Sequence, residues 1–248
     1  MSDWCIVCPT RGRADTIEGR TAKFFPNIIY VMGPEDKPKY IEQAGMSENQ
    51  IMVVQSKGIT NVMAEVMERR KERTIVRIDD DLKSVSSVVG QRQRKYTEEE
   101  DLLAIIENSM EISRDLGLSL FHWGFSRNPM YYAPFSPFGL FSESAAQIYG
   151  INDRKIVYDT RLKTREDLDV SLQAYRDDRV AFRDMRFIFQ FTQVFEGTGG
   201  LQLTRDDETR AKDTELMLRK WAPFIEIDDS TDMVRIKFKR TNERANVK

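Results

Sequence analysis

Three consecutive aspartates, Asp79, Asp80 and Asp81, form the densest group of side chains that could perform chemistry. They directly follow the apolar run 74–78, which predicts a buried strand. Because alternate residues of an extended chain project to the same side, Asp79 and Asp81 are expected to point the same way. Clustered carboxylates bind Mg²⁺ or Mn²⁺, and such a cation can also bind a diphosphate. A solvated acidic turn explains the same pattern, so both interpretations stay open on this motif alone.

A basic loop follows the first apolar run, 4–8. In a parallel sheet, loops at the carboxyl ends of strands form the ligand crevice. Glycine lets the backbone approach a ligand closely, and arginines bind phosphate oxygens or stack on a base. An ordinary loop between a strand and a helix is the alternative. The candidate ligand-binding residues of this loop are Pro9, Thr10, Arg11, Gly12 and Arg13.

A second loop, 57–61, opens an expected helix after the third apolar run. Backbone N–H groups at the start of a helix favour an anion, which makes Lys57 and Gly58 candidates for contact with a phosphate. Asn61 could form a hydrogen bond with a base or a sugar. The alternative is that Thr60 is only the N-cap of the helix.

Two adjacent acids, Glu166 and Asp167, lie at the start of another expected helix. The helix dipole is expected to lower the pKa of a carboxylate there, so that it is ionised and able to accept a proton. The alternative is structural, because Asp167 and Thr164 have the spacing of a capping box.

Aromatic residues crowd the segment 121–141, which holds eight of the 25 aromatic side chains of the chain. This density indicates either a specialised surface or a dense strand core. The segment includes the single histidine, His122, beside Trp123. A lone histidine among aromatic residues is more commonly structural than catalytic.

The elements that must position these side chains follow from the apolar pattern. Strands that alternate with helices indicate βαβ units and a mostly parallel sheet. The expected strands are 4–8, 27–32, 51–54 and 74–78, and the expected helices between them are 38–44 and 60–70.

The remaining chain predicts further helices and strands. Thr97 and Glu100 have the spacing of a capping box before a long helix. A helix is also expected from Thr164 onward. Beyond it the pattern predicts a strand at 180–195, a helix at 207–220 and a last strand at 234–238.

Composition excludes several classes of protein. The 248 residues are enough for one domain or two small ones, and 40% hydrophobic with 31% charged residues is an ordinary soluble balance. No apolar run approaches the roughly 20 residues that span a bilayer. One histidine excludes a multi-histidine metal site and the His-Cys-Cys site of deaminases. The net charge of -2 means that a nucleic-acid partner must be held by local patches.

The two cysteines indicate a reducing compartment. Cys5 and Cys8 both fall in the first expected strand, where residues three apart point to opposite faces, so a disulfide between them is not expected. The first residues include Asp3 and no basic stretch, which is unlike a secretory signal. We therefore expect a cytoplasmic protein, in the host cytoplasm if a phage encodes it.

Taken in order along the chain, these motifs resemble an A-type glycosyltransferase, a family with a nucleotide-sugar-binding α/β sheet, an aspartate (DxD) motif and a later acidic base. Three segments, 9–13, 78–81 and 165–169, are similar to a narrower group, the TET-associated glycosyltransferases. The resemblance covers roughly residues 4–200. It implies an α/β fold of the A type, Rossmann-like with a mostly parallel mixed sheet, over 1–205. Residues 206–248 would add a C-terminal helix and a basic tail packed on the same domain.

The resemblance also implies roles for the residues that match its motifs. Asp79 would bind the ribose side of the donor and Asp81 a Mn²⁺ or Mg²⁺ ion on the diphosphate, with Asp79 as a second metal ligand. Asp167 would be the catalytic base, with Glu166 as the second candidate. The remaining donor-binding residues would be Thr10, Arg11, Arg13, Asn61 and Asp80. A-type enzymes often add a late histidine metal ligand, and no histidine follows His122 here, so the third ligand stays unassigned.

The narrower group implies an acceptor and a reaction. Its members are predicted to act on 5-hydroxymethylpyrimidines in phage DNA, so the expected reaction transfers glucose from a UDP-sugar to 5-hydroxymethylcytosine. The basic segment 91–95 and the basic tail would meet phosphates. A non-DNA acceptor, a nucleotidyltransferase and a non-catalytic nucleic-acid-binding module of the same fold are the alternatives. The expected acceptor-binding residues are His122, Trp123, Arg127 and Tyr131.

Overall fold

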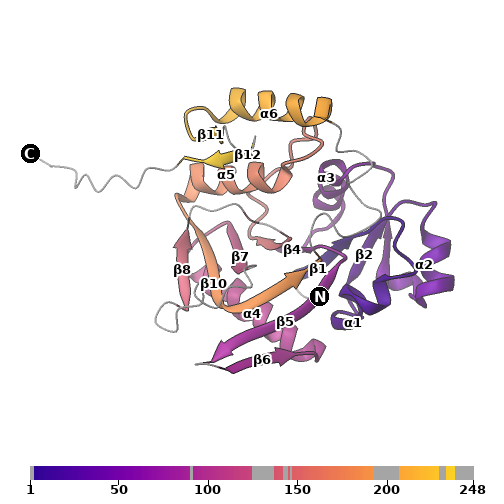
Figure 1. Cartoon of the computed structure of the whole chain (residues 1–248). Coiled ribbons are helices and arrows are strands. Elements are labelled where there is room, and N and C mark those ends of the chain that lie inside the picture. The colour runs from indigo at the N-terminus through magenta and orange to yellow at the C-terminus, as the bar shows by residue number, and fades with distance from the viewer. Residues whose placement is uncertain are drawn as a thin grey trace, which may run out of the picture.

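A computed structural model describes residues 3–89, 92–124, 137–141, 145, 147–192, 207–228 and 233–237. Its centre is a ten-stranded sheet with the strand order β3-β2-β1-β4-β9-β7-β10-β5-β6, and β8 pairs with β10 beside this path (Figure 1). The strands are β1 (Trp4–Pro9), β2 (Ile29–Met32), β3 (Ile51–Val53), β4 (Thr74–Ile78), β5 (Leu82–Val89), β6 (Arg92–Tyr96), β7 (Leu120–Gly124), β8 (Phe138–Phe141), β9 (Ile148–Ile151) and β10 (Ala181–Phe191).

The sheet is mixed, which confirms the expected α/β class. The four strands from the start of the chain, β3, β2, β1 and β4, pair in parallel, so their carboxyl ends meet at one edge. β9 then runs antiparallel to both β4 and β7. β7 and β10 are parallel to each other, and β10 also pairs antiparallel with β5.

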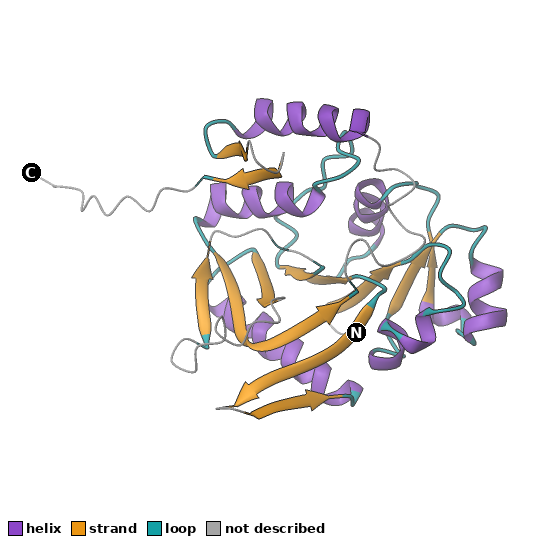
Figure 2. Ribbon diagram, viewed as in Figure 1, coloured by secondary structure: helices purple, strands orange, loops and turns teal. Residues whose placement is uncertain are grey.

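Helices cover both faces of the sheet (Figure 2). Their apolar residues recur at helical spacing, so each helix buries one stripe against the strands. The helices are α1 (Thr21–Phe24), α2 (Lys37–Ala44), α3 (Ile59–Arg69), α4 (Glu99–Asp115), α5 (Glu166–Asp178) and α6 (Asp207–Trp221), with short 3₁₀ turns η1 (Ile17–Gly19) and η2 (Glu48–Gln50).

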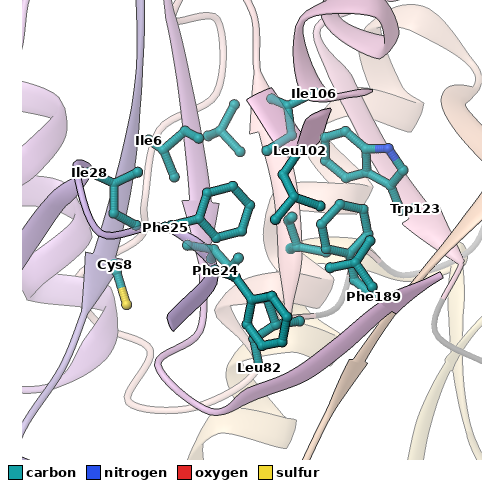
Figure 3. Packing of buried hydrophobic residues seen from close by; sticks show 14 of the residues in the cluster. Ile6, Cys8, Phe24, Phe25, Ile28, Leu82, Leu102, Ile106, Trp123 and Phe189 are labelled. Carbon is teal, nitrogen blue, oxygen red and sulfur yellow. The ribbon is translucent and has the colours of Figure 1, made fainter. Parts of the chain in front are cut away.

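The sheet separates two hydrophobic clusters. On one face α4 packs Leu102 and Ile106 together with Phe25 and Trp123 (Figure 3). On the other face α3 and α5 cover the strands, with residues such as Met63 and Val170 in the cluster. β4 contributes Val76 to the first cluster and Ile75 to the second, so consecutive side chains of this strand alternate between the two faces.

The C-terminal elements pack on α5 (Figure 1). Met217 and Trp221 of α6 form a third cluster with Leu168 and Leu172 of α5. The small antiparallel sheet of β11 (Ile225–Asp228) and β12 (Met233–Ile236) adds to this cluster. None of the described helices is long and apolar enough to cross a membrane. Both cysteines are free, as the sequence predicts.

The structure corrects both predicted capping boxes. The Thr97 hydroxyl donates to the side chain of Glu98, the N-cap residue of α4, and no side-chain cap is formed there. The Thr164 hydroxyl donates to Asp213 of α6 at 2.7 Å. α5 therefore begins after Arg165, which has a left-handed backbone (φ 64°) and gives no side-chain cap. In both places the threonine hydroxyl donates to a carboxylate and does not cap a backbone N–H of the helix.

Candidate active site

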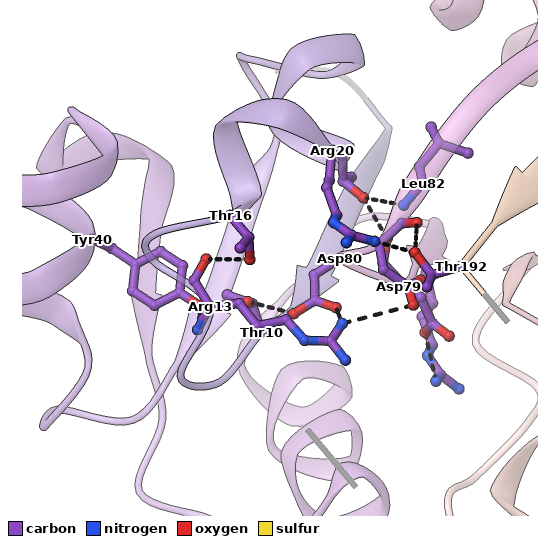
Figure 4. A network of polar contacts seen from close by, with 12 residues as sticks. Thr10, Arg13, Thr16, Arg20, Tyr40, Asp79, Asp80, Leu82 and Thr192 are labelled. Atoms are coloured by element: carbon purple, nitrogen blue, oxygen red, sulfur yellow. Dashed lines mark hydrogen bonds and ion pairs between the residues drawn. The ribbon is translucent and has the colours of Figure 1, made fainter. Parts of the chain in front are cut away.

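The loop after β1 and the aspartates after β4 meet at the edge where these parallel strands end (Figure 4). The Thr10 hydroxyl donates to Asp80 Oδ2 at 2.7 Å, and Arg13 Nη1 donates to Asp80 Oδ1. The Tyr40 hydroxyl lies 2.6 Å from Thr10 Oγ1 and accepts from the Arg13 backbone N–H at 3.0 Å. Asp80 is buried, and both its oxygens hold the loop in place.

Unlike Asp80, Asp81 does not use both of its carboxylate oxygens to hold the neighbouring loop. Its Oδ1 is buried and has no hydrogen-bond partner among the described residues. Its Oδ2 is 3.8 Å from Arg13 Nη1. Burial, together with the charges of Asp79 and Asp80, raises the pKa of Asp81 to about 6. An unpartnered buried carboxylate oxygen is costly, so this atom is suited to a cation or a hydrogen-bond donor from a ligand.

The backbone of the acidic segment is held from several sides. The Thr21 hydroxyl donates to the Asp79 carbonyl at 2.7 Å, and the Asp79 N–H donates to the Gln147 carbonyl at 2.9 Å. The Thr192 N–H donates to the Asp81 carbonyl at 3.1 Å, and Arg20 contacts the Thr192 hydroxyl (Figure 4). The aspartates are thus fixed before any ligand binds.

A buried arginine links the aspartates to α5. Arg77, 5% exposed, donates from Nη2 to Asp79 Oδ1 at 2.9 Å and from Nη1 to Glu166 Oε1 at 3.0 Å. Burial raises the pKa of Asp79 against the lowering effect of Arg77. The two acidic segments, 79–81 and 166–167, therefore lie together although 89 positions separate Arg77 from Glu166.

The pKa of Asp167 is shifted in the direction opposite to the expected one. Burial, together with the charge of Glu166, raises its pKa to about 7, whereas the sequence predicts a pKa lowered by the helix dipole. The Leu168 N–H donates to Asp167 Oδ1 at 2.7 Å, which opposes this shift without cancelling it. A carboxylate with a pKa near 7 is well matched to general-base catalysis at neutral pH.

The donor atoms fit a divalent cation in part. Among the described residues, no three His, Cys, Asp or Glu side chains are grouped to hold a metal ion. Asp79 is hydrogen-bonded to Arg77, whereas Asp81 Oδ1 has no partner in the part of the chain that the structure describes. Mg²⁺ commonly binds one or two carboxylates and completes its shell with water and substrate phosphates, so Asp81 suits such an ion bound together with a diphosphate.

The remaining donor-binding candidates belong to the loop after β1 and to the start of α3. Arg11 and Gly12 are exposed in the loop after Pro9, the last residue of β1, and Gly12 has φ 63°, a conformation that favours glycine. Asn61 Nδ2 donates to the Lys57 carbonyl at 3.0 Å.

Thr60 is not the N-cap residue of α3, which corrects the alternative drawn from the sequence. Gly58, with φ 84°, is its N-cap residue. Thr60 is inside the helix and buried.

Two expected acceptor residues are in the core, which corrects their placement on an acceptor-binding surface. Trp123 is 1% exposed, packs edge-on against Phe121 at 5.4 Å between ring centroids, and donates to Ser109 Oγ at 3.1 Å. His122 is fully buried, and burial and Arg183 lower its pKa to about 3, so it is neutral. Of the other candidates, Arg127 and Tyr131 lie outside the described residues.

Several residues of the site were not predicted from the sequence. Arg77 carries one available signal, because a charged residue inside an otherwise apolar strand needs a buried partner. No local pattern indicates the others, since their partners lie far away along the chain. They are Arg20, Thr21, Tyr40, Tyr149 and Thr192.

Fold and site together define an α/β protein with an acidic site at the carboxyl edge of parallel strands. No family model and no curated protein matches the sequence. Among solved structures, S. aureus TarS 1-349 in complex with UDP is similar at a TM-score of 0.48 and 11% identity, over 97% of this chain and 98% of that chain. CMP:2-keto-3-deoxy-manno-octonic acid synthetase complexed with CTP is similar at 0.44 and 11%, over 89% and 100%. These likenesses are distant.

Proposed function

We propose that this protein is a glycosyltransferase that moves a sugar from a nucleotide-sugar donor to an acceptor hydroxyl. The observation that supports the proposal is the meeting of two acidic segments, 79–81 and 166–167, beside the loop that carries Arg13. One segment has a carboxylate oxygen available to a metal and the other a carboxylate with a pKa near 7. Sugar transfer needs both a group that neutralises the leaving diphosphate and a base for the incoming hydroxyl.

The donor side of the site is assigned to Asp81 and the loop after β1. A Mg²⁺ or Mn²⁺ ion held by Asp81 would neutralise charge on the leaving diphosphate. Arg13 and the exposed backbone at Gly12 would bind phosphate or the nucleoside. A UDP-sugar, with glucose as the sugar, is the donor that the family resemblance favours.

The acceptor side is assigned to Asp167. Its carboxylate accepts the proton of the attacking hydroxyl, and a direct displacement at the anomeric carbon inverts the configuration there. We propose 5-hydroxymethylcytosine in DNA as the acceptor, on the family resemblance. The exposed side chains of Arg94 and Lys95 on the edge strand β6 offer positive charge for a phosphate backbone.

The test is mass spectrometry of hydroxymethylated DNA incubated with a panel of nucleotide sugars and Mn²⁺. We expect a mass increase of one hexose from one donor, and no product with DNA that lacks the hydroxymethyl group. Release of UDP with a different acceptor would contradict the DNA assignment alone. Transfer of label from the α-phosphate of a nucleoside triphosphate would show a nucleotidyltransferase and contradict the proposal.

A further inference from the structure

A single buried guanidinium contacts both acidic segments of the candidate site. Arg77 lies near the end of β4, and its two terminal nitrogens donate to Asp79 Oδ1 at 2.9 Å and Glu166 Oε1 at 3.0 Å. Asp79 follows the strand, and Glu166 is the first residue of α5. One rigid planar group therefore connects the end of β4 to the start of α5.

A third contact fixes the orientation of this guanidinium. Arg77 Nη1 also donates to the Tyr149 hydroxyl at 3.1 Å, from the residue opposite it in the β4–β9 pair. The Tyr149 hydroxyl lies 2.7 Å from the Tyr158 hydroxyl, and Tyr158 belongs to the segment that leads into α5. All three side chains are buried, where hydrogen bonds are electrostatically stronger than in water.

The charge on Arg77 is as important as its shape. Asp79 and Glu166 carry like charges in a poorly solvated place, and they would repel each other without a cation between them. Lysine would keep the charge, but its ammonium is a point charge on a flexible stem and lacks the fork of two donors. The geometry of the site therefore depends on arginine at this position.

We propose that Arg77 is a positioning residue that fixes the start of α5 relative to the aspartates after β4. The inference rests on the proposed function, because it assigns the donor to one segment and the base to the other. Arg77 itself is enclosed by protein groups and is not assigned any contact with substrate. A displacement of about 1 Å between reacting groups can cost roughly 100-fold in rate, so loss of this link should act on turnover.

The test compares Arg77→Lys with the matched control Arg114→Lys. Arg114 is also a largely buried arginine bound to β4, but it donates to Thr74 Oγ1 at 2.7 Å, at the opposite end of the strand. We expect Arg77→Lys to lower kcat by about 100-fold and to change the KM for the donor by less than about threefold. Arg114→Lys should leave both constants within about twofold of wild type, at a similar loss of thermal stability.

Hydrogen exchange gives a readout that does not depend on sugar transfer. In Arg77→Lys, the amides of Asp79 and Asp169 should both exchange faster than in Arg114→Lys, because the strand end and the helix start lose their common anchor. If wild type transfers sugar and Arg77→Lys keeps its kcat within about threefold, the inference is wrong. If wild type transfers no sugar, the proposed function fails, and unchanged exchange at both amides then overturns the positioning role as well.

Discussion

The carboxylates of the site are chemically alike and differ in what surrounds each one. The carboxylate of Asp80 accepts hydrogen bonds from Thr10 and Arg13, and that of Asp79 accepts one from Arg77. Asp81 keeps a buried oxygen without a described partner, and Asp167 has a pKa raised to about 7. Hydrogen bonds to the ionised form lower a pKa and burial raises it, so position decides which acid is structural and which is reactive.

Asp81→Asn tests the metal-binding role. The substitution removes the negative charge that a divalent cation needs, so the affinity for UDP in the presence of Mn²⁺ should fall at least about tenfold. The affinity of wild type should also fall as the pH drops below about 6, where Asp81 becomes protonated. Isothermal calorimetry with and without Mn²⁺ measures both effects. Equal affinities in wild type and the variant would remove Asp81 from the metal site.

Asp167→Asn tests the base. Asparagine cannot accept the proton, so kcat should fall by about 100-fold or more with donor affinity unchanged. In wild type the rate should rise with pH up to about 7 and level off above it, as Asp167 loses its proton. A pH–rate profile and donor titrations check this prediction. Near-normal turnover of the folded variant would refute the assignment.

The raised pKa of Asp167 also predicts a dependence of stability on pH. The folded state disfavours the ionised carboxylate relative to the unfolded state, so this group lowers the free energy of unfolding as pH rises from about 4 to about 7. Asp167→Asn removes that effect. Relative to wild type, the variant should be more stable at pH 8 than at pH 4 by at least about 1 kcal/mol in urea unfolding. A difference of the opposite sign would show that the pKa is lowered.

At the scale of elements, β4 and α5 carry the site, and β7 supports it from the core. β7 alternates Phe121 and Trp123 toward α4, with His122 on the other face, and all three side chains are buried. Phe121 and Trp123 therefore serve packing, whereas Phe138 of the same aromatic-rich segment is 42% exposed.

Trp123→Phe distinguishes packing from acceptor binding. The smaller ring leaves a cavity and removes the hydrogen bond that Trp123 Nε1 donates to Ser109 Oγ. The free energy of unfolding should therefore fall by about 1–3 kcal/mol. The KM for the acceptor should stay within about twofold of wild type. Urea unfolding and steady-state kinetics measure the two quantities. A large rise in KM at unchanged stability would return Trp123 to the acceptor site.

At the scale of the whole molecule, the C-terminal helix helps to place the start of α5. Asp213 of α6 accepts hydrogen bonds from the N–H groups of Lys163 and Thr164, the latter at 2.6 Å, and from the Thr164 hydroxyl. Trp221 Nε1 donates to Asp169 Oδ1 at 2.7 Å. The described elements after residue 206 thus hold the helix that carries Asp167.

Asp213→Ala should weaken this support. Loss of a buried carboxylate that accepts several hydrogen bonds is expected to cost about 2–4 kcal/mol of unfolding free energy and to lower kcat along with it. Lys212→Ala is the control, since Lys212 is exposed on the same helix and forms a surface ion pair with Glu208. The control should change stability by less than about 0.5 kcal/mol. Equal effects of both substitutions would contradict the supporting role of Asp213.

The sequence by itself determined what local patterns encode. Apolar runs and helical spacing identified the first four strands and the helices α2 and α3 between them, but not the short α1. Turn residues after each apolar run identified the site loops. The acids 79–81 and 166–167 were found because charged residues at the end of a strand or the start of a helix are visible in the sequence. These features depend on residues a few positions apart, which a single sequence records directly.

Only the tertiary structure decided which of these side chains are available for chemistry. Arg77 and Glu166 meet across 89 positions, and Thr10 and Asp80 across 70. Such contacts depend on strand register and on which face each side chain occupies, and neither follows from local propensity. Tertiary contacts also pair Asp80 with Arg13, leave Asp81 Oδ1 without a partner among the described residues and enclose His122. They also raise the pKa of Asp167 where the sequence predicts a lowered one, because burial and the charge of Glu166 outweigh the hydrogen bond from the Leu168 N–H.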